Sequence, residues 1–267
     1  MSDSLSHWLA LREAADTAAR SAALTRAIAA TLPIERPVHI LDLGTGTGSN
    51  VRYLSQHLPV PQDWLLVDRD PALLAEVPAR MTNCHIETRR TELGALDDPT
   101  IFAGRNLVTA SALLDLVSER WLRALARRCR ERGAVALFAL TYSGRSRCSP
   151  AEPEDDTIRD LMNRHQKAND KGFGPAAGPD AVDCAERYFA SAGYRVRREP
   201  SDWVLPPDAR ELQRQLIEGW AEAAVEVAPE QSALINSWLT RRLAHVEGNH
   251  SRILVGHEDL AAWLPSG

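Results

Sequence analysis

The stretch that decides the fold is Ile40-Leu41-Asp42-Leu43-Gly44-Thr45-Gly46-Thr47-Gly48-Ser49-Asn50. Its apolar start predicts a buried strand over Val38–Leu43 that ends at Gly44. Three alternate glycines follow, which supply tight backbone angles and let a ligand lie against bare main chain. A helix is predicted directly after them, over Ser49–Leu58, and its first turn offers free amide N–H groups. The stretch therefore predicts a strand, a ligand-binding loop and a helix start in immediate succession.

The spacing of the glycines separates this loop from two common nucleotide-binding loops. A dinucleotide-binding loop has the spacing G-x-G-x-x-G, whereas here the third glycine, Gly48, comes one place early and position 49 is serine. A P-loop needs Gly-Lys-Ser/Thr, and this stretch has no lysine. A chance glycine-rich turn after a strand remains the alternative interpretation.

Short apolar runs and helical stretches alternate on both sides of this loop. Strands are predicted at 38–43, 64–67, 84–88, 107–110, 134–142, 195–203 and 252–255. Helices are predicted at 4–32, 49–58, 71–77, 118–132, 157–167, 180–192, 207–227 and 230–247. Because strands that alternate with helices are joined by crossovers, the pattern predicts an α/β fold with a mainly parallel sheet.

The motif apolar-apolar-Asp-x-Gly-x-Gly-x-Gly resembles the first motif of class I S-adenosylmethionine-dependent methyltransferases, and the resemblance covers residues 38–142 by motif. It implies a Rossmann-like, seven-stranded, mostly parallel sheet with helices on both faces. It also implies an N-terminal helix and extra C-terminal helices that form a lid. The expected cofactor is S-adenosyl-L-methionine, and the expected product is S-adenosyl-L-homocysteine.

The resemblance also assigns cofactor contacts at the ends of successive strands. Asp68 ends the second strand, 20 residues after Gly48, where a carboxylate can accept hydrogen bonds from both ribose hydroxyls. Glu92 and Leu93 would flank the adenine, although an exposed glutamate is the alternative, and Ser111 would line the methionine part. The predicted cofactor-binding residues are Asp42, Gly44, Thr45, Gly46, Gly48, Asp68, Arg69, Glu92, Leu93 and Ser111.

Candidate substrate contacts follow the fourth and fifth predicted strands. Asp115 is either a substrate-side carboxylate or the cap of the helix that begins near Ser118. Asp170 and Lys171 are candidates to bind a charged acceptor. Phe173, in the segment Gly-Phe-Gly-Pro, is a candidate to fold over that acceptor.

Methyl transfer from a sulfonium is an in-line displacement that relies on positioning, so one general base or none is expected. His165 is the candidate base because imidazole titrates near neutral pH, and a surface histidine is the alternative. Tyr142 is the second candidate catalytic residue, because it leaves the fifth predicted strand on the ligand side of the sheet. Arg12 and Arg20 either meet a carboxylate or lie on a solvated helix. The remaining histidines show no ligand spacing, so no metal site is predicted.

The chain length of 267 residues predicts one α/β domain, 1–267. Within it we expect an N-terminal helical cap at 1–36 and a cofactor-binding core at 37–142. A substrate-loop insertion is expected at 143–180. The remaining sheet, 181–267, contains two inserted helices at about 207–247.

Composition restricts the partners and the compartment. The net charge of −5 argues against a broadly basic surface for nucleic acid. The four cysteines form no C-x-x-C pair, which predicts separate reduced thiols in a cytoplasmic protein. We find no signal peptide and no apolar run near the ~18 residues of a membrane span.

The predicted function is methyl transfer to a small-molecule acceptor by an enzyme that is a monomer or homodimer. An RNA or protein methyltransferase is one alternative, supported only by the arginine-rich segment 120–132. A catalytically inactive cofactor-binding module is another, because fold does not fix function. An NAD-dependent oxidoreductase is the third.

Overall fold

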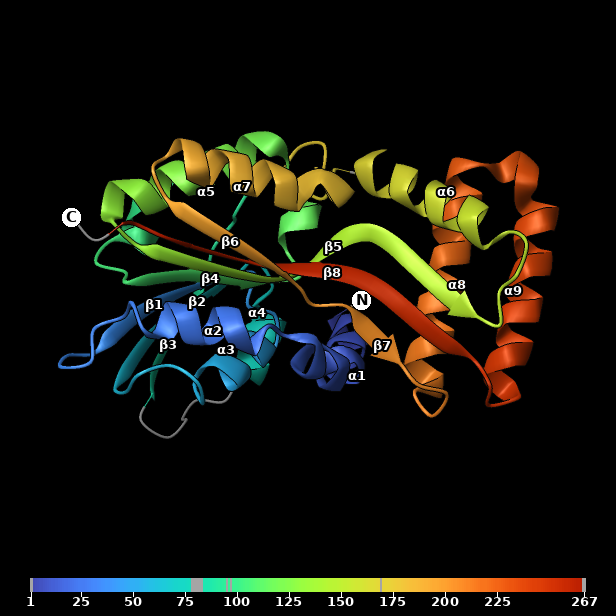
Figure 1. Ribbon diagram of the computed structural model, residues 1–267, viewed down its shortest axis with the longest axis horizontal. Helices are drawn as coiled ribbons and strands as arrows, with labels where there is room; N and C mark the ends of the chain where they lie inside the picture. Colours follow the sequence, from blue (N-terminus) through green and yellow to red (C-terminus); the bar gives the residue numbers. More distant parts are fainter. Residues whose placement is uncertain (1, 78–83, 95, 97, 169, 266–267) are drawn as a thin grey trace.

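The computed structural model describes residues 2–77, 84–94, 96, 98–168 and 170–265. A central sheet carries helices on both faces, and its two longest strands extend toward a separate group of helices (Figure 1).

The strand order of the sheet is β3-β2-β1-β4-β5-β8-β6, and β7 pairs with β8. The strands are β1 (Val38–Leu43), β2 (Gln62–Asp68), β3 (Cys84–Arg90), β4 (Leu107–Ser111), β5 (Val135–Ser149), β6 (Arg195–Pro200), β7 (Trp203–Leu205) and β8 (Arg252–Trp263). β1 to β5 are parallel, whereas β8 is antiparallel to β5, β6 and β7. The prediction of a mostly parallel, Rossmann-like sheet is confirmed. The order reverses between β1 and β4, where open α/β sheets bind ligands at the carboxyl ends of their strands.

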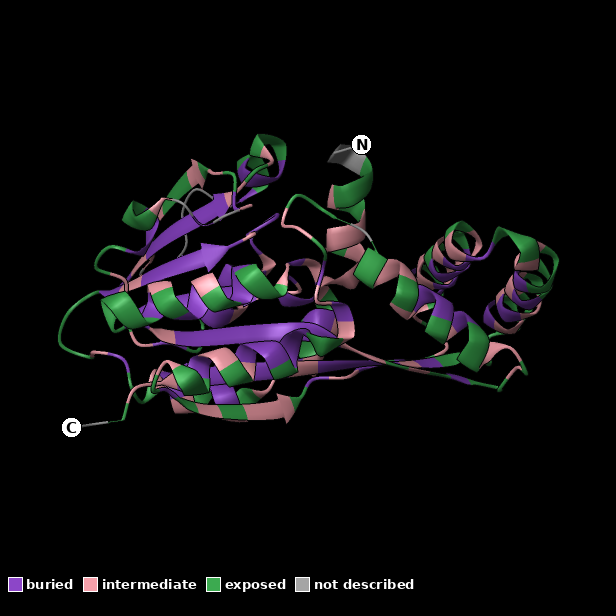
Figure 2. Cartoon of the chain, turned by 90° about the horizontal axis from the view of Figure 1, so that it is seen from above, coloured by how far each residue is buried: buried purple, intermediate pink, exposed green. Residues whose placement is uncertain are grey.

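The two faces of the sheet are covered by different helices, and alternate side chains of β1 point to each. Ile40 packs in the core beneath α2 and α3, together with Ile28 of α2. Leu41 packs in the core beneath α5 and α7, together with Phe189 of α7. Figure 2 shows the inner strands of the sheet as buried between these layers, whereas the edge strands β3 and β6 are intermediate or exposed. The helices on the sheet are α2 (Ala22–Ala29), α3 (Ser49–Leu54), α4 (Pro71–Glu76), α5 (Glu119–Arg132) and α7 (Ala181–Ser191).

Beyond the sheet, β5 and β8 continue as a ribbon toward three helices, α6 (Asp155–Ala168), α8 (Arg210–Val227) and α9 (Ser232–Glu247) (Figure 1). These three helices and the ribbon are called the distal helical module below. Its core includes Ile158, Ile217, Trp238 and Ile253, one from each helix and one from β8. Each of these side chains is almost fully buried, so the module has an apolar core of its own.

The first helix, α1 (Ser2–Ala19), lies between the sheet and the distal helical module (Figure 1). Arg52 of α3 donates two hydrogen bonds to the Glu13 carboxylate, each 2.6 Å long. Trp203 of β7 donates to Asp16 through its indole nitrogen, at 3.0 Å. These contacts hold α1 against the carboxyl edge of the sheet on one side and against the ribbon on the other.

The prediction of one helix over 4–32 is wrong, because the chain breaks between α1 and α2 at Ser21. Ser21 has extended backbone angles (φ −72°, ψ 100°), and its hydroxyl accepts from the Leu24 amide at 3.2 Å. Its own amide donates to Asp259 Oδ2 at 2.8 Å. Ser21 is therefore the N-cap of a second helix, a role that serine favours.

The predicted ends of two strands are also wrong. β5 continues past Tyr142 to Ser149, so residues 143–149 of the expected loop insertion are strand. β8 extends from Arg252 to Trp263 rather than ending at Val255. Residues 143–149 are largely polar and resemble a loop, but antiparallel pairing such as Ser146 with Val255 satisfies their backbone groups. The strand predicted at 195–203 is divided into β6 and β7.

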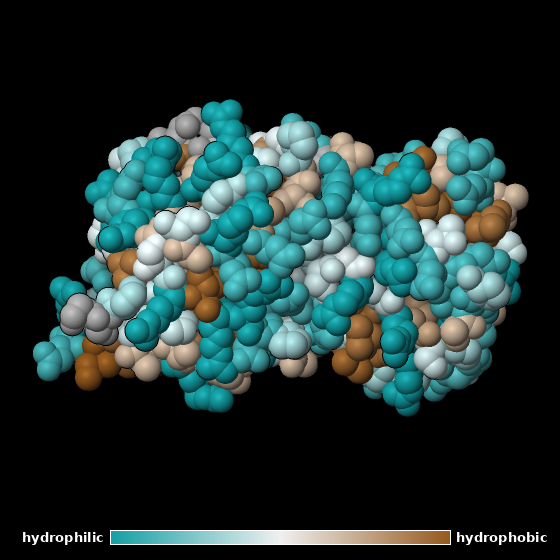
Figure 3. Space-filling view, turned by 45° about the horizontal axis from the view of Figure 1, so that its top comes forward, coloured by the Kyte–Doolittle hydropathy of each residue, from teal (hydrophilic) through white to brown (hydrophobic). Residues whose placement is uncertain are grey.

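On the face that Figure 3 draws, hydrophobic residues form small separate areas in a mainly hydrophilic surface. Among the described residues, no helix combines the length and the apolar character needed to cross a bilayer.

Candidate functional site

The glycine loop at the end of β1 depends on backbone angles that favour glycine. Gly44, Gly46 and Gly48 have positive φ values of +64°, +56° and +86°. The Thr45 amide donates to the Val67 carbonyl of β2 at 3.1 Å, which holds the loop across the ends of both strands. Gly48 is the N-cap residue of α3. The loop thus presents main chain, rather than side chains, at the carboxyl edge of the sheet.

Beneath the loop lies a buried polar network centred on Asp42. Its carboxylate accepts from Thr45 Oγ1 at 2.8 Å and from Asn50 Nδ2 at 2.6 Å. Burial raises the pKa of Asp42 to about 6, and these hydrogen bonds oppose the rise. Arg20 donates to Asn50 Oδ1 at 2.8 Å, and burial lowers the pKa of Arg20. The sequence did not single out Asn50, which links the loop to the N-terminal helices.

Asp68, at the end of β2, lies across from the glycine loop. Its Oδ2 accepts from the Gly46 amide at 2.8 Å, and its Oδ1 accepts from the Asp70 amide at 3.0 Å. Each carboxylate oxygen has a second acceptor site, so Asp68 can hold the loop and still accept from a ligand. Asp70 itself caps α4 by accepting from the Ala72 amide at 2.9 Å.

These elements enclose a cavity of about 300 Å³ at the carboxyl edge of the sheet. That volume is within the range of small-molecule sites. Most of the residues predicted to bind a cofactor or substrate lie in its wall. They are Gly44, Thr45, Gly46, Asp68, Arg69, Glu92, Leu93, Ser111, Lys171 and Phe173.

Residues 170–174 form one side of the cavity. Asp170 does not line the cavity but shapes the turn, because its Oδ1 accepts from the amides of Gly172, Phe173 and Gly174 at 2.7–3.0 Å. Arg69 donates to the Lys171 carbonyl at 3.3 Å, which joins this turn to the end of β2.

α1 forms another side of the cavity, in which Arg12 is the residue that the sequence had singled out. Leu5, Leu9, Arg12 and Asp16 all line it. Arg12 donates to both oxygens of Asp16, at 2.9 and 3.1 Å. Of the two arginines considered from sequence, Arg12 lies in the cavity wall and Arg20 lies in the network beneath the glycine loop. An arginine and an aspartate four residues apart form an ordinary helical pair, so their spacing carries no signal of a site.

The comparisons with known proteins bear on the fold. No family model matches the chain, and no curated protein does. A structure of a candidate type II methyltransferase from Anaeromyxobacter dehalogenans is similar, with 19% identity, coverage of 91% of this chain and 97% of that chain, and a TM-score of 0.50.

The chain has a Rossmann-like methyltransferase fold.

Two further structures with this fold are less similar. An S-adenosylmethionine-dependent methyltransferase from Geobacter sulfurreducens, in complex with S-adenosyl-L-homocysteine, has 14% identity and a TM-score of 0.46, with 92% of each chain covered. The YcgJ protein from Bacillus subtilis has 12% identity and a TM-score of 0.48, with 91% of this chain and 99% of that chain covered.

Both candidate catalytic residues lie outside the cavity of this methyltransferase fold. His165 of α6 contacts Glu226 of α8, with 2.7 Å between Nε2 and Oε2. The Tyr142 hydroxyl donates to Asn163 at 2.9 Å, and burial raises the pKa of Tyr142. Neither lines the cavity, because β5 continues beyond Tyr142 and α6 packs on α8.

Asp115 is buried just behind the cavity wall. It does not cap α5, because the side chain that accepts from the first turn is Ser118, which bonds the Trp121 amide. The expectation of a cap at Asp115 is therefore wrong. Burial raises the pKa of Asp115, and its Oδ1 has no hydrogen-bond partner among the described residues.

The described ranges contain no group of three His, Cys, Asp or Glu side chains that could hold a metal ion. The predicted C-terminal lid is also not seen at this cavity, since no described residue of α8 or α9 lines it.

Proposed function

We propose that this protein is an S-adenosyl-L-methionine-dependent methyltransferase that acts on a small molecule. The observation that carries the proposal is the pairing, in one cavity, of bare main chain at Gly44 and Gly46 with the carboxylate of Asp68. A nucleoside uses both features. Its ribose hydroxyls donate to a carboxylate, and the bare main chain of glycines lets the ligand approach the backbone closely.

The cavity residues fit this cofactor in a consistent order. Asp68 would accept from the ribose hydroxyls, and Leu93 would pack on the adenine while Glu92 accepts from its amino group. Ser111, at the end of β4, would meet the methionine part. All four line the same cavity. A side chain at Gly46 would enter that space, since a Cβ there would lie 3.1 Å from Leu9 Cδ1.

The bound cofactor supplies a methyl group activated by a sulfonium. Asp68, Glu92, Leu93 and Ser111 would hold the cofactor, whose methyl group would then be available for in-line transfer to a nucleophilic atom of the acceptor. The protein's part is to orient the reactants and exclude water, which in well-oriented systems gains up to ~7–11 kcal/mol. α1 serves this purpose by closing one side of the cavity through Leu5 and Leu9.

A small acceptor is favoured over RNA by the charge at the cavity. Arg12 is paired with Asp16, and Asp68, Asp70 and Glu92 add negative charge to the wall. The two other cations in the described wall, Arg69 and Lys171, are outnumbered by these three acids, whereas a polyanion needs a track of several cations. The separate cysteines and the absence of a spanning helix among the described residues support a cytoplasmic location as part of this proposal.

The proposal is tested by titrating the purified protein with S-adenosyl-L-homocysteine and with NAD⁺ in a calorimeter. We expect S-adenosyl-L-homocysteine to bind and NAD⁺ not to. In Gly46→Val the affinity should fall about 10- to 100-fold, because the new side chain occupies the cavity. Binding of NAD⁺ alone, or unchanged affinity in Gly46→Val, would overturn the proposal.

Gly104→Val is the matched control for backbone strain. Gly104 has φ +69°, close to that of Gly46, but a Cβ there meets nothing within 4 Å. Each valine should cost about 1–2 kcal/mol of folding stability through its left-handed backbone. Only Gly46→Val should also lose ligand affinity.

A further inference from the structure

A second hollow lies beside the cavity, between α1 and α8. Its volume is about 750 Å³, and its apolar wall consists of Leu5 and Trp8 from α1 and Leu216 and Trp220 from α8. It is open to solvent along one side. We call it the α1–α8 groove.

The groove is continuous with the cavity. Leu5, Arg69 and Asp70 line both spaces. Arg69 and Asp70 are also the only charged residues among the described ones that line the groove, and both lie where it meets the cavity. The groove is therefore charged at its junction with the cavity and mainly apolar elsewhere, with Ser4 and Gln215 as further polar residues of its wall.

We propose that the α1–α8 groove binds the methyl acceptor, and that this acceptor is a flat aromatic molecule whose nucleophilic group points into the cavity. The inference rests on the proposed function, because it places the acceptor next to the methyl donor. Its nucleophile-bearing end lies by Arg69 and Asp70, and its apolar body lies between Trp8 and Trp220.

An aromatic body matches the wall that the groove presents. Leu5, Leu216 and Trp8 offer apolar contacts, and Trp220 adds only a small part of its side chain because it is 8% exposed. An aromatic ligand gains stability against a tryptophan ring beyond simple burial. A nucleic acid would need several cations along its path, and Arg69 is the only one in the described part of this wall. A charged peptide would lose hydration against the tryptophans and leucines, and the described wall offers it few polar partners, namely Ser4, Gln215, Arg69 and Asp70.

Gly219 of α8 offers a way to fill the groove without disturbing the fold. It lies in the groove wall within the helix, and a Cβ at this position meets nothing within 4 Å. Replacing a helical glycine also raises helix propensity, so Gly219→Phe should fold. Ala233→Phe is the matched control, because Ala233 is exposed on α9 and is not part of the groove.

The experiment measures binding of 2-naphthol and indole to the whole protein, with and without saturating S-adenosyl-L-homocysteine. We expect wild type and Ala233→Phe to bind at least one of these probes. We expect the affinity of Gly219→Phe for that probe to be lower by a factor of about ten or more. The affinity for S-adenosyl-L-homocysteine should be the same in all three proteins.

The outcomes separate this inference from the proposed function. If S-adenosyl-L-homocysteine binds but neither probe binds wild type, or if Gly219→Phe binds the probe as wild type does, the groove proposal is wrong and the proposed function stands. If S-adenosyl-L-homocysteine does not bind, the proposed function fails. Probe binding that Gly219→Phe abolishes would then still support an aromatic site in the groove.

Discussion

The cavity at the carboxyl edge of the sheet and the distal helical module both contain dense polar groups, but those groups have different partners. At the cavity, Asp68 bonds to backbone amides and keeps acceptor capacity toward an open space. In the distal helical module, carboxylates bond to cationic side chains in a closed set.

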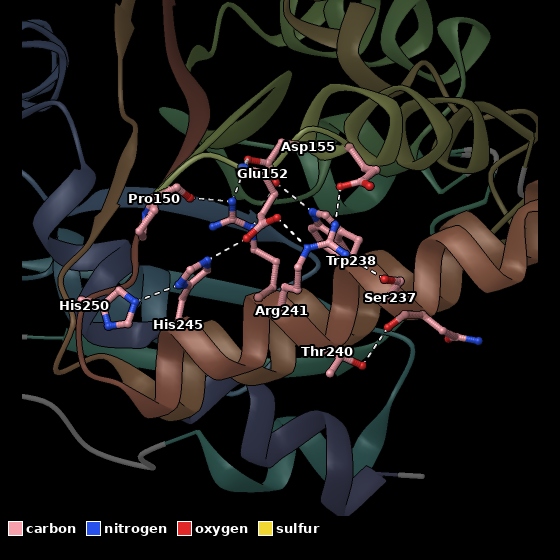
Figure 4. Close-up of polar contacts among 12 residues, drawn as sticks. Pro150, Glu152, Asp155, Ser237, Trp238, Thr240, Arg241, His245 and His250 are labelled. Carbon is pink, nitrogen blue, oxygen red and sulfur yellow. Dashed lines mark hydrogen bonds and ion pairs between the residues drawn. The ribbon is translucent and has the colours of Figure 1, made fainter.

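Figure 4 shows that closed set around α9. Glu152 accepts from Arg241 at 2.6 Å and contacts His245 at 2.8 Å, and His245 contacts His250 at 2.8 Å (Figure 4). Trp238 donates to Asp155 at 2.8 Å. The loop between β5 and α6 is thereby fastened to α9 by side chains that bond to one another.

The difference shows which polar residues indicate binding. A buried carboxylate that is paired with an arginine stabilises the fold. A carboxylate that accepts from backbone amides at a cavity can still accept further hydrogen bonds from a ligand. Loss of the first kind should therefore affect folding, and loss of the second kind should affect ligand affinity. Substitutions in both regions test this separation.

The largest effect is expected for Asp155→Ala. Arg242 is fully buried and donates to both oxygens of Asp155, at 3.0 and 2.8 Å. Removing the carboxylate leaves a buried charge without its partner, which costs about 3–5 kcal/mol of folding stability. Chemical denaturation monitored by circular dichroism measures this loss.

Asp156→Ala is the control for that substitution. Asp156 pairs with Arg159 on the surface, where its side chain is 83% exposed. Such a pair contributes roughly 0–1 kcal/mol. If both variants lost the same free energy of unfolding, the buried pair of Asp155 and Arg242 would stabilise the fold no more than an exposed pair does.

The next effect concerns Asp68→Ala. Loss of the carboxylate removes the acceptor for the ribose hydroxyls and releases the Gly46 amide. Affinity for S-adenosyl-L-homocysteine should fall by about 1–3 kcal/mol, measured by calorimetry. Asp63→Ala is the control, because Asp63 lies at the opposite end of β2 and contacts the exposed histidines His39 and His85. Wild-type affinity in Asp68→Ala would contradict the assignment of this residue.

Sequence predicted the cavity well where its residues lie directly at strand ends. The glycine loop and Asp68 each follow an apolar run, and sequence order alone brings the carboxyl ends of parallel strands to one edge. Glu92, Leu93 and Ser111 were placed in the wall by the same logic. Whether they bind the predicted cofactor stays a prediction.

Residues whose position depends on long-range pairing could not be predicted in this way. Tyr142 was taken as the end of β5, but pairing with β8 extends that strand to Ser149 and moves its true end away from the cavity. His165 lies in α6, which comes after this longer strand and therefore belongs to the distal helical module. An N-terminal helical cap and Arg12 were considered from sequence, but Leu5, Leu9 and Asp16 were not singled out, because only tertiary packing brings them to the glycine loop.

A smaller effect, dependent on pH, distinguishes two buried groups in the two regions. His257 of β8 packs against Trp203, and burial lowers its pKa from 6.5 to about 3, with Arg12 contributing. Its favourable contribution to stability is complete above pH 6.5 and is lost as the pH falls toward 3. Asp42 behaves oppositely, because its pKa is raised from 3.8 to about 6. Its contribution is complete below pH 3.8 and is lost as the pH rises through 6.

Urea denaturation at about pH 7 and about pH 5 measures how the free energy of unfolding of each protein changes with pH, which is called the pH slope here. In His257→Asn the free energy of unfolding should fall less on acidification than in wild type, by up to about 1.4 kcal/mol per pH unit. In Asp42→Asn it should fall more than in wild type. A His257→Asn slope equal to that of wild type would show that the buried imidazole does not resist protonation.

The smallest effect is expected where α1 is held over the cavity. Glu13 and Arg52 form a two-bond ion pair, with side chains 30% and 29% exposed, that joins α1 to α3. Glu13→Gln should cost under about 1 kcal/mol of stability, because water competes with a pair exposed to this extent. The pair nevertheless holds the helix that carries Leu9 against the glycine loop, so S-adenosyl-L-homocysteine should dissociate about two- to fivefold faster. Stopped-flow displacement measures that rate.

Thr17→Ala is the control for the ion pair, because Thr17 is an exposed residue of the same helix and does not line the cavity. It should leave the dissociation rate unchanged. If Glu13→Gln also releases the ligand at the wild-type rate, α1 is a fixed wall of the cavity. The hydrogen bond between Trp203 and Asp16, rather than the ion pair with Arg52, would then keep the helix in place.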